Sequence, residues 1–205
     1  MIKELNSIEK IVSHRLENDQ ISEQELRIVL TQLQQTASIE GDVVEFGCYN
    51  GATSVAMGKV LQATNKRLFL YDSFQGLPEK TSEDRSLIGM QFTTGELRAS
   101  KKLVADRFKQ AGLKRPVIKK AWFDELTARD LPDKISFAFL DGDYYESVLV
   151  SLSLVYPRLQ QGAVIVVDDY DNDQLPGASK AVDTWLSTHV FHKDVVSSLA
   201  VLRAK

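Results

Sequence analysis

Acidic residues stand at or just after the ends of four apolar runs, each with the length of a buried strand. They are Glu45, Asp72, Asp141, Asp143, Asp168 and Asp169. Any one of them could simply cap a helix, because short acidic side chains are favoured there for their hydrogen bonding. Their repetition points further, since carboxylates gathered at one edge of a sheet repel one another unless a cation compensates them.

Two kinds of chemistry fit these acids. Asp72 follows Glu45 by about 27 positions, near the ~20-residue interval at which an acid binds ribose hydroxyls in nucleotide-binding folds. Asp141, Asp168 and Asp169 could surround one ion if their strands are neighbours, about 4.8 Å apart. All-oxygen ligation suits Mg²⁺, and no pair of His or Cys has the spacing of zinc ligands. The alternative is that these acids only cap helices or pair with Lys and Arg.

The segment VVEFGCYNGATS, residues 43–54, predicts a strand, a turn and the start of a helix. Gly47 and Gly51 bracket the turn, where the absence of a Cβ lets a ligand approach the backbone. Tyr49 and Asn50 occupy its middle, so the spacing is not the G-x-G-x-x-G of dinucleotide-binding folds. The pattern therefore favours a cofactor without a pyrophosphate, although an ordinary strand-to-helix connection remains an alternative.

Length and composition exclude several classes of protein. A chain of 205 residues with 43% hydrophobic residues is sufficient for one domain with a sizeable core. The net charge of −3 argues against nucleic acid as the main partner. Cys48 is the single cysteine, so an intrachain disulfide is excluded. The sequence has neither an apolar signal region nor a run of membrane-spanning length, and we expect a cytoplasmic protein without a membrane partner.

The elements that must position the acids alternate between strand and helix. Strands are expected at 42–46, 67–72, 116–120, 135–140, 163–168, 190–196 and 198–203. Helices are expected at 2–18, 22–38, 52–64, 98–111, 145–156 and 177–188, the second opening with a capping box of Ser22 and Glu25. This order predicts an α/β fold with a mostly parallel sheet, helices on both faces and an antiparallel last strand. Ligands then bind beyond the carboxyl ends of the strands.

Two segments are assigned separate roles. Residues 1–40 would form an N-terminal helical cap on a domain of residues 41–205. Residues 74–98 make a long connection of the kind that is usually functional or disordered. We expect this segment to be a lid, with apolar contacts from Phe74, Leu77, Met90 and Phe92.

The first motif resembles that of class I S-adenosylmethionine-dependent methyltransferases, in the E-x-G-x-x-x-G form of the catechol O-methyltransferases. With YDSFQGLPE, FTTGELRAS, FLDGDYYES and VVDDYDNDQLPGASKAVDTW, the chain resembles the macrocin O-methyltransferase family from about residue 25 to residue 188. That family methylates sugar hydroxyls of natural products and uses Mg²⁺. The resemblance implies the Rossmann-like methyltransferase sheet, with the N-terminal helices as an extension.

The resemblance also implies roles for individual residues. The cofactor-binding residues would be Glu45, Gly47, Asn50, Gly51, Asp72, Ser73, Trp122 and Phe123. The metal ligands would be Asp141, Asp168 and Asp169. Asp143 would support the metal ligands or help to accept a proton. The catechol enzymes have a lysine where this chain has Tyr144, which shifts the role of proton acceptor towards Asp141.

The favoured function is therefore Mg²⁺-dependent methyl transfer from S-adenosylmethionine to a hydroxyl of a small acceptor, with a sugar as the expected acceptor. Alternatives are an NAD(P)-dependent oxidoreductase of similar topology and a non-catalytic cofactor-binding or assembly protein. Apolar residues at helical spacing near the N-terminus, Ile2, Leu5, Ile8, Ile11 and Val12, would pack on the same chain. A homodimer in which they cover the partner's site is the alternative.

Overall fold

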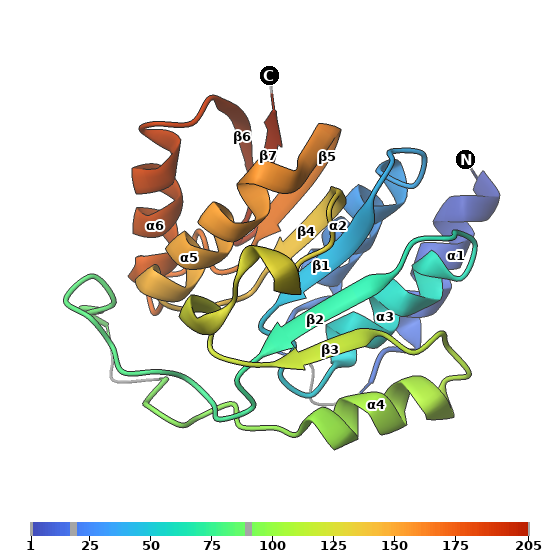
Figure 1. Cartoon of the computed structure of the whole chain (residues 1–205), viewed down its shortest axis with the longest axis horizontal. Coiled ribbons are helices and arrows are strands. Elements are labelled where there is room, and N and C mark those ends of the chain that lie inside the picture. The colour runs from blue at the N-terminus through green and yellow to red at the C-terminus, as the bar shows by residue number, and fades with distance from the viewer. Residues whose placement is uncertain (1, 17–19, 89–91, 205) are drawn as a thin grey trace.

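One seven-stranded sheet organises the computed structural model, which describes residues 2–16, 20–88 and 92–204, with the backbone alone for 2–7. The strands are β1 (Asp42–Phe46), β2 (Leu68–Asp72), β3 (Val117–Lys120), β4 (Ile135–Leu140), β5 (Leu159–Val167), β6 (Phe191–Val196) and β7 (Leu199–Ala204). Their order across the sheet is β3-β2-β1-β4-β5-β7-β6 (Figure 1). The expected α/β architecture is confirmed.

The direction of the strands also follows the prediction. β1 to β5 pair in parallel, whereas β7 runs antiparallel to both β5 and β6. The connection between β6 and β7 is too short for a crossover, which forces the antiparallel arrangement. The strand order reverses at β1, between β2 and β4, so the carboxyl end of β1 lies where ligands bind in such sheets.

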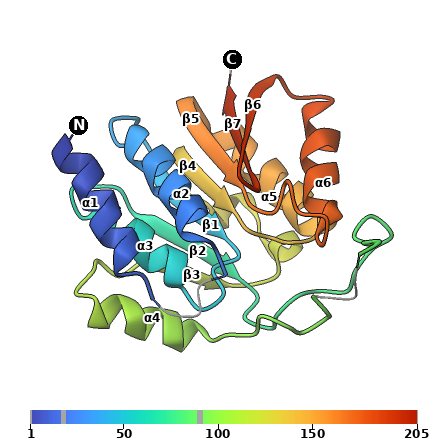
Figure 2. The same cartoon turned by 180° about the vertical axis from the view of Figure 1, so that it is seen from behind.

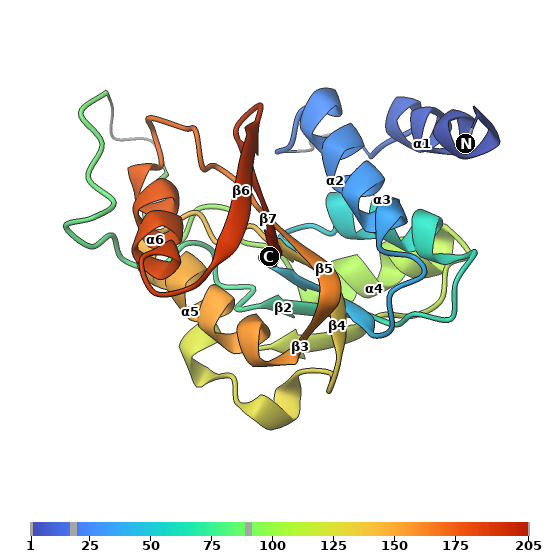
Figure 3. The same cartoon turned by 90° about the horizontal axis from the view of Figure 1, so that it is seen from above.

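Helices cover both faces of the sheet. They are α1 (Ile2–Ser13), α2 (Glu23–Gln35), α3 (Ala52–Leu61), α4 (Lys101–Gln110), α5 (Tyr145–Val155) and α6 (Pro176–Leu186), with short 3₁₀ helices at Phe123–Glu125, Ala128–Asp130 and Tyr156–Arg158. Figure 2 shows α1, α2, α3 and α4 on one face, and Figure 3 shows α5 and α6 on the other. Each layer buries its own apolar cluster against the sheet.

The apolar residues of α1 pack within the chain. Ile8, Ile11 and Val12 are buried in the cluster that α2 and α3 share with the sheet. The same-chain packing expected for the N-terminal stripe is therefore observed for these three residues. The side chains of Ile2 and Leu5 lie outside the described residues.

Several boundaries differ from the sequence prediction. α1 ends at Ser13, and the expected continuation to residue 18 runs into positions outside the described ranges. β5 begins at Leu159 rather than residue 163, through a polar stretch that pairs at its start with Ile135. The capping box of Ser22 and Glu25 is present at the start of α2. Within the described ranges, none of the helices is long and apolar enough to cross a membrane.

Candidate active site

A cavity of about 740 Å³ opens beyond the carboxyl ends of β1, β2, β4 and β5. Most of the residues singled out in the sequence line it: Glu45, Gly47, Asn50, Asp72, Ser73, Trp122, Phe123, Asp141, Asp143, Asp168 and Asp169. Gly51 does not line it. Gly51 instead begins α3 with φ +81°, and a Cβ there would lie 3.0 Å from Val104 of α4, so its backbone serves the turn and helix packing.

The turn after β1 is held rigidly from inside the protein. Glu45 is 1% exposed and accepts a hydrogen bond from the Ser54 hydroxyl, which joins the strand end to α3. The Asn50 carboxamide oxygen accepts from the Ala52 N–H at 3.0 Å and from an Arg107 Nη at 2.6 Å. The backbone N–H of Gly47 donates to the carbonyl of Tyr71 at 2.9 Å. These contacts set the shape of the loop before any ligand is bound.

Asp72 connects two loops as well as facing the cavity. One carboxylate oxygen accepts the Tyr49 N–H at 2.8 Å and the other accepts the Phe74 N–H at 2.6 Å. Burial raises the pKa of Asp72, although these N–H donors act in the opposite direction. The backbone N–H and the thiol of Cys48 also lower the pKa of Asp72 by hydrogen bonding, so donors from both loops hold this carboxylate at the wall of the cavity.

Changing Asp72 to Ala should weaken binding of S-adenosylmethionine by about 1.5–3 kcal/mol, the scale for hydrogen bonds to a charged group. The two backbone N–H groups also lose their acceptor, so the turns at Tyr49 and Phe74 should loosen. Calorimetric titration measures the affinity, and a thermal melt reports whether the variant folds. Unchanged affinity in a folded variant would contradict the ribose-binding role.

Four carboxylates converge at the ends of β4 and β5. Ligand oxygens of Asp141, Asp143 and Asp169 all lie within 4.8 Å of one another. The backbone keeps these ends level, because the Asp141 N–H donates to Phe46 at 2.8 Å and the Asp168 N–H donates to Leu140 at 2.9 Å. Asp143 and Asp169 both adopt positive φ, 59° and 55°, a conformation that Asp tolerates better than most residues.

The group of three differs from the predicted ligand set. Asp143 belongs to it, whereas the predicted ligand Asp168 does not. An oxygen of Asp168 accepts the backbone N–H of Asp169 at 2.9 Å, which turns this carboxylate towards its own loop. Asp168 nevertheless remains close, since its charge is the largest contribution after burial to the raised pKa of Asp141.

The electrostatics of this edge fit a hard divalent cation. Burial, followed by mutual repulsion, raises the pKa of Asp141, Asp143 and Asp168. Neither these three nor Asp169 forms an ion pair with the side chains that the structure describes. Gathered oxygen ligands with uncompensated charge are the donor set that Mg²⁺ prefers.

Aromatic residues close the cavity beside β2 and β3. The N–H of Ala121 donates to the carbonyl of Asp72 at 3.0 Å, which places Trp122 and Phe123 directly after this junction. The Phe123 ring packs edge-on against Phe46, 5.2 Å between centroids. Both aromatic residues line the cavity and offer an apolar surface of the kind that accommodates a planar ring.

The segment 74–98 borders the same cavity, and its described parts contain neither helix nor strand. Leu77 and Phe92 line the wall, whereas Phe74 is buried in the cluster under α3 and α4. Met90 lies outside the described residues.

Among the described residues, seven acids that were not predicted from the sequence also line the cavity: Glu25, Glu79, Asp84, Asp124, Glu125, Glu146 and Asp171. Two of them, Glu25 and Asp84, are held by contacts with distant parts of the chain. Glu25 caps α2 through one oxygen and accepts from the hydroxyls of Ser197 and Ser198 through the other. Burial raises its pKa, but the donors outweigh burial and lower it to about 2. Asp84, in the loop after β2, is 2% exposed. The capping box was a visible signal for Glu25, whereas no local pattern identifies Asp84.

The sequence matches the family "Macrocin-O-methyltransferase (TylF)" over residues 19–199. It is 30% identical over 143 residues to the 8-demethyl-8-(2,3-dimethoxy-alpha-L-rhamnosyl)-tetracenomycin-C 4'-O-methyltransferase of Streptomyces olivaceus, covering 66% of this chain and 55% of that protein. It is 26% identical over 168 residues to the mycinamicin III 3''-O-methyltransferase of Micromonospora griseorubida, covering 77% and 65%. These matches thus span less than two thirds of either relative.

Solved structures agree on the fold. The O-methyltransferase NovP superposes with a TM-score of 0.81 at 20% identity, over 100% of this chain and 98% of that one. The calicheamicin methyltransferase CalS11 superposes with a TM-score of 0.71 at 18% identity, over 98% and 91%.

Proposed function

Because the chain belongs to the macrocin O-methyltransferase family, we propose that it transfers a methyl group from S-adenosylmethionine to a hydroxyl of a small acceptor. The observation that carries the proposal is the meeting of two sites in one cavity. The turn of Glu45 and Gly47 with Asp72 forms one side, and the carboxylates of β4 and β5 form the other. A cofactor held by the first side would face an acceptor held by the second.

The residues divide the reaction between them. Asp72 holds the ribose, the turn after β1 holds the methionine part, and Trp122 and Phe123 border the adenine. Holding sulfonium and hydroxyl in line is the larger contribution to the rate, because the methyl group is already activated. Asp141, with Asp143 beside it, accepts the proton of the attacking hydroxyl.

Mg²⁺ is the divalent ion that we assign to the cluster formed by Asp141, Asp143, Asp168 and Asp169. Asp141 and Asp169 would hold it, with Asp143 or Asp168 as a third ligand. When bound, the ion lowers the cost of developing negative charge on the acceptor oxygen. The oxidoreductase alternative is disfavoured by family membership and by the missing G-x-G-x-x-G, and the complete set of acids speaks against a non-catalytic protein.

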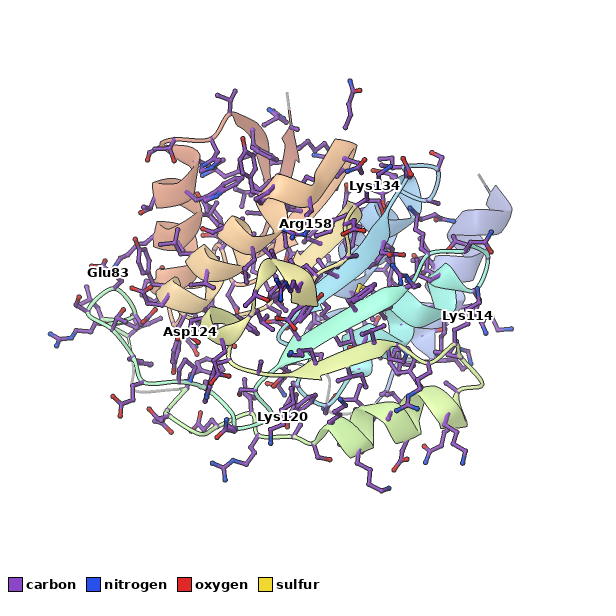
Figure 4. All side chains as sticks on the ribbon, viewed as in Figure 1. Glu83, Lys114, Lys120, Asp124, Lys134 and Arg158 are labelled. Atoms are coloured by element: carbon purple, nitrogen blue, oxygen red, sulfur yellow. The ribbon has the colours of Figure 1, made fainter. Side chains whose placement is uncertain are left out.

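A sugar hydroxyl is the proposed acceptor. The names of both relatives specify O-methyl transfer, and one name includes a rhamnosyl group. The negative charge of the cavity restricts the class of acceptor further, because the described residues that line it include many acids but no Lys, Arg or His. Figure 4 shows Asp124 near the carboxyl edge of the sheet, with Lys114 and Lys134 towards the opposite edge. We therefore propose an acceptor that carries no phosphate or carboxylate.

Methyl transfer from labelled S-adenosylmethionine to a panel of sugars tests this assignment. The panel should pair a neutral glycoside and an amino glycoside with a nucleoside diphosphate sugar. We expect transfer to neutral or amino members and none to the nucleotide sugar. The lining side chains that the structure describes include no Lys, Arg or His to bind a diphosphate, and the proposed Mg²⁺ would already be held by the carboxylates and the acceptor hydroxyl. Preferential methylation of the nucleotide sugar would contradict the acceptor class while leaving methyl transfer intact. Failure to bind S-adenosylmethionine would contradict the function itself.

The lid and the homodimer stay proposals. Residues 74–98 would cover cofactor and acceptor, and the N-terminal helices would close the side of the cavity at Gln20 and Ile21. A second copy is not required for the burial of Ile8, Ile11 and Val12.

A further inference from the structure

Asp84 is a buried carboxylate whose role the proposed reaction does not explain. It is 2% exposed although it lies in a loop whose nearby residues Leu87 and Ile88 are 104% and 63% exposed. One of its oxygens accepts from the backbone N–H and the hydroxyl of Thr81, at 2.9 Å and 2.7 Å. The other accepts from the backbone N–H of Tyr145 at 2.7 Å.

The contact with Tyr145 supplies a helix cap from a distant part of the chain. Tyr145 is the first residue of α5, and its predecessor Tyr144 makes no side-chain cap. The first N–H groups of a helix have no partner within the helix, so an outside acceptor stabilises them. A carboxylate is the strongest acceptor for that position, because it also interacts favourably with the positive end of the helix dipole.

The capped end of α5 directly follows two acids of the active site. Asp141 and Asp143 lie four and two residues before Tyr145, and the N–H of Tyr144 donates to the carbonyl of Gly142 at 2.6 Å. Asp143 has φ 59°, a conformation that the surrounding contacts must maintain. Fixing the Tyr145 N–H therefore limits how far Asp143 can turn.

The Asp84 carboxylate also lies against the start of α6, the helix that follows β5. A Cβ on Gly177, the second residue of α6, would lie 1.9 Å from the Asp84 oxygen and 2.7 Å from the Tyr145 nitrogen. Before α6, Leu175 packs with Tyr144 and Leu77, and its N–H donates to Asn172 at 2.9 Å. Asn172 in turn donates to Asp169 at 2.7 Å. Asp84 thus lies where the loop, α5 and α6 meet.

We propose that Asp84 is a positioning residue that holds Asp143 and Asp169 in register for the divalent ion. The inference rests on the proposed function, since it gives the register a purpose. Asp84 acts through the backbone of α5 and through the start of α6, since both of its oxygens accept hydrogen bonds from the protein. Asp84 thereby connects the loop after β2 to the cluster of Asp141, Asp143 and Asp169.

Two variants remove the hydrogen bond between the Tyr145 N–H and Asp84 in different ways. Asp84→Ala deletes the carboxylate, whereas Gly177→Ala leaves every polar group in place and displaces the carboxylate with one methyl group. Asp84→Asn should recover part of the effect, because its amide oxygen can still accept from Tyr145 while its NH₂ cannot accept from Thr81. Glu83→Gln is the matched control. Glu83 is a half-exposed acid of the same loop (Figure 4), and its carboxylate pairs with Lys180.

Three measurements decide the proposal in variants that melt cooperatively. Mn²⁺ affinity, followed by electron paramagnetic resonance, should fall about 10–100-fold in Asp84→Ala and Gly177→Ala, the range for residues that orient metal ligands. Affinity for S-adenosylmethionine should change little, because Glu45 and Asp72 are untouched. Hydrogen exchange at the Tyr145 amide should accelerate in both variants and stay unchanged in Glu83→Gln.

Wild-type Mn²⁺ affinity in both folded variants would overturn the proposal, as would unchanged exchange at Tyr145. A purely structural role would lower the melting temperature without separating Mn²⁺ from S-adenosylmethionine affinity. If the wild-type protein binds no Mn²⁺, the metal part of the proposed function fails, and hydrogen exchange alone decides whether Asp84 positions the turn.

Discussion

Asp141→Asn is expected to lower the rate of methyl transfer by about 10²–10⁴-fold, the range for loss of a proton-accepting group. Asn keeps the size of the side chain but accepts no proton and offers only a neutral oxygen to a cation. The cofactor side of the cavity is unchanged, so affinity for S-adenosylmethionine should remain within a few-fold. Single-turnover assays with labelled cofactor measure the chemical step separately from binding.

Two control variants test whether the loss of rate is specific to the acids clustered at the carboxyl ends of β4 and β5. Asp168→Asn should be milder, because Asp168 lies outside the group of three and an Asn oxygen can still accept the Asp169 N–H. Asp133→Asn, an exposed acid at the opposite end of β4, should behave as wild type. A chelator should silence the wild type reversibly. Full turnover by Asp141→Asn, or in excess chelator, would refute the assigned chemistry.

Gly47→Ala is expected to destabilise the fold by about 3–5 kcal/mol, among the largest effects of a single substitution. Gly47 has φ +85°, and a Cβ there would lie 1.7 Å from the backbone carbonyl oxygen of Asp141. The Cβ would be attached rigidly to the backbone of residue 47, and the oxygen belongs to the backbone of Asp141. The clash can therefore be relieved only by moving the turn after β1 away from the end of β4. Urea unfolding measures the loss, and calorimetry should show that the folded fraction binds S-adenosylmethionine weakly.

Gly112→Ala separates this clash from backbone strain alone. Gly112 has φ +63°, but a Cβ there would meet nothing within 4 Å. It should therefore cost only about 1–2 kcal/mol, the penalty for a left-handed conformation. Equal losses in the two variants would mean that the close approach of Gly47 to Asp141 has no energetic weight.

Much of the scaffold followed from local pattern. Val43 and Val44 predicted a buried strand, Ser22 and Glu25 predicted a helix start, and both are present. Strands separated by helices call for right-handed crossovers and a mostly parallel sheet, so the alternation of elements along the chain implied this architecture. The acids at the strand ends could then be assigned to one edge without any coordinates. Most of the predicted site residues do line one cavity there.

Local pattern could not decide which acids meet. Sequence neighbours such as Asp168 and Asp169 look equivalent, yet backbone φ and one N–H donor send their carboxylates in different directions. Asp143 joined the group through its left-handed turn, and Gly51 moved away from the cavity because α4 packs against it.

Sequence patterns were enough to predict which segments form strands, the turn after β1 and the chemistry available at the carboxyl edge, because these depend on residues close together in the chain. The order of the strands across the sheet depends on pairing between distant segments and came from the structure. The distant partners of Glu25 and Asp84 followed only from the tertiary structure. Glu25 accepts from Ser198 in the β6–β7 turn, and Asp84 accepts from the N–H of Tyr145 at the start of α5. Such contacts span 173 and 61 positions, and no periodicity or cap motif encodes them. They arise only when separate elements pack on the same sheet and bury each other's polar groups, which must then find acceptors and donors across the fold.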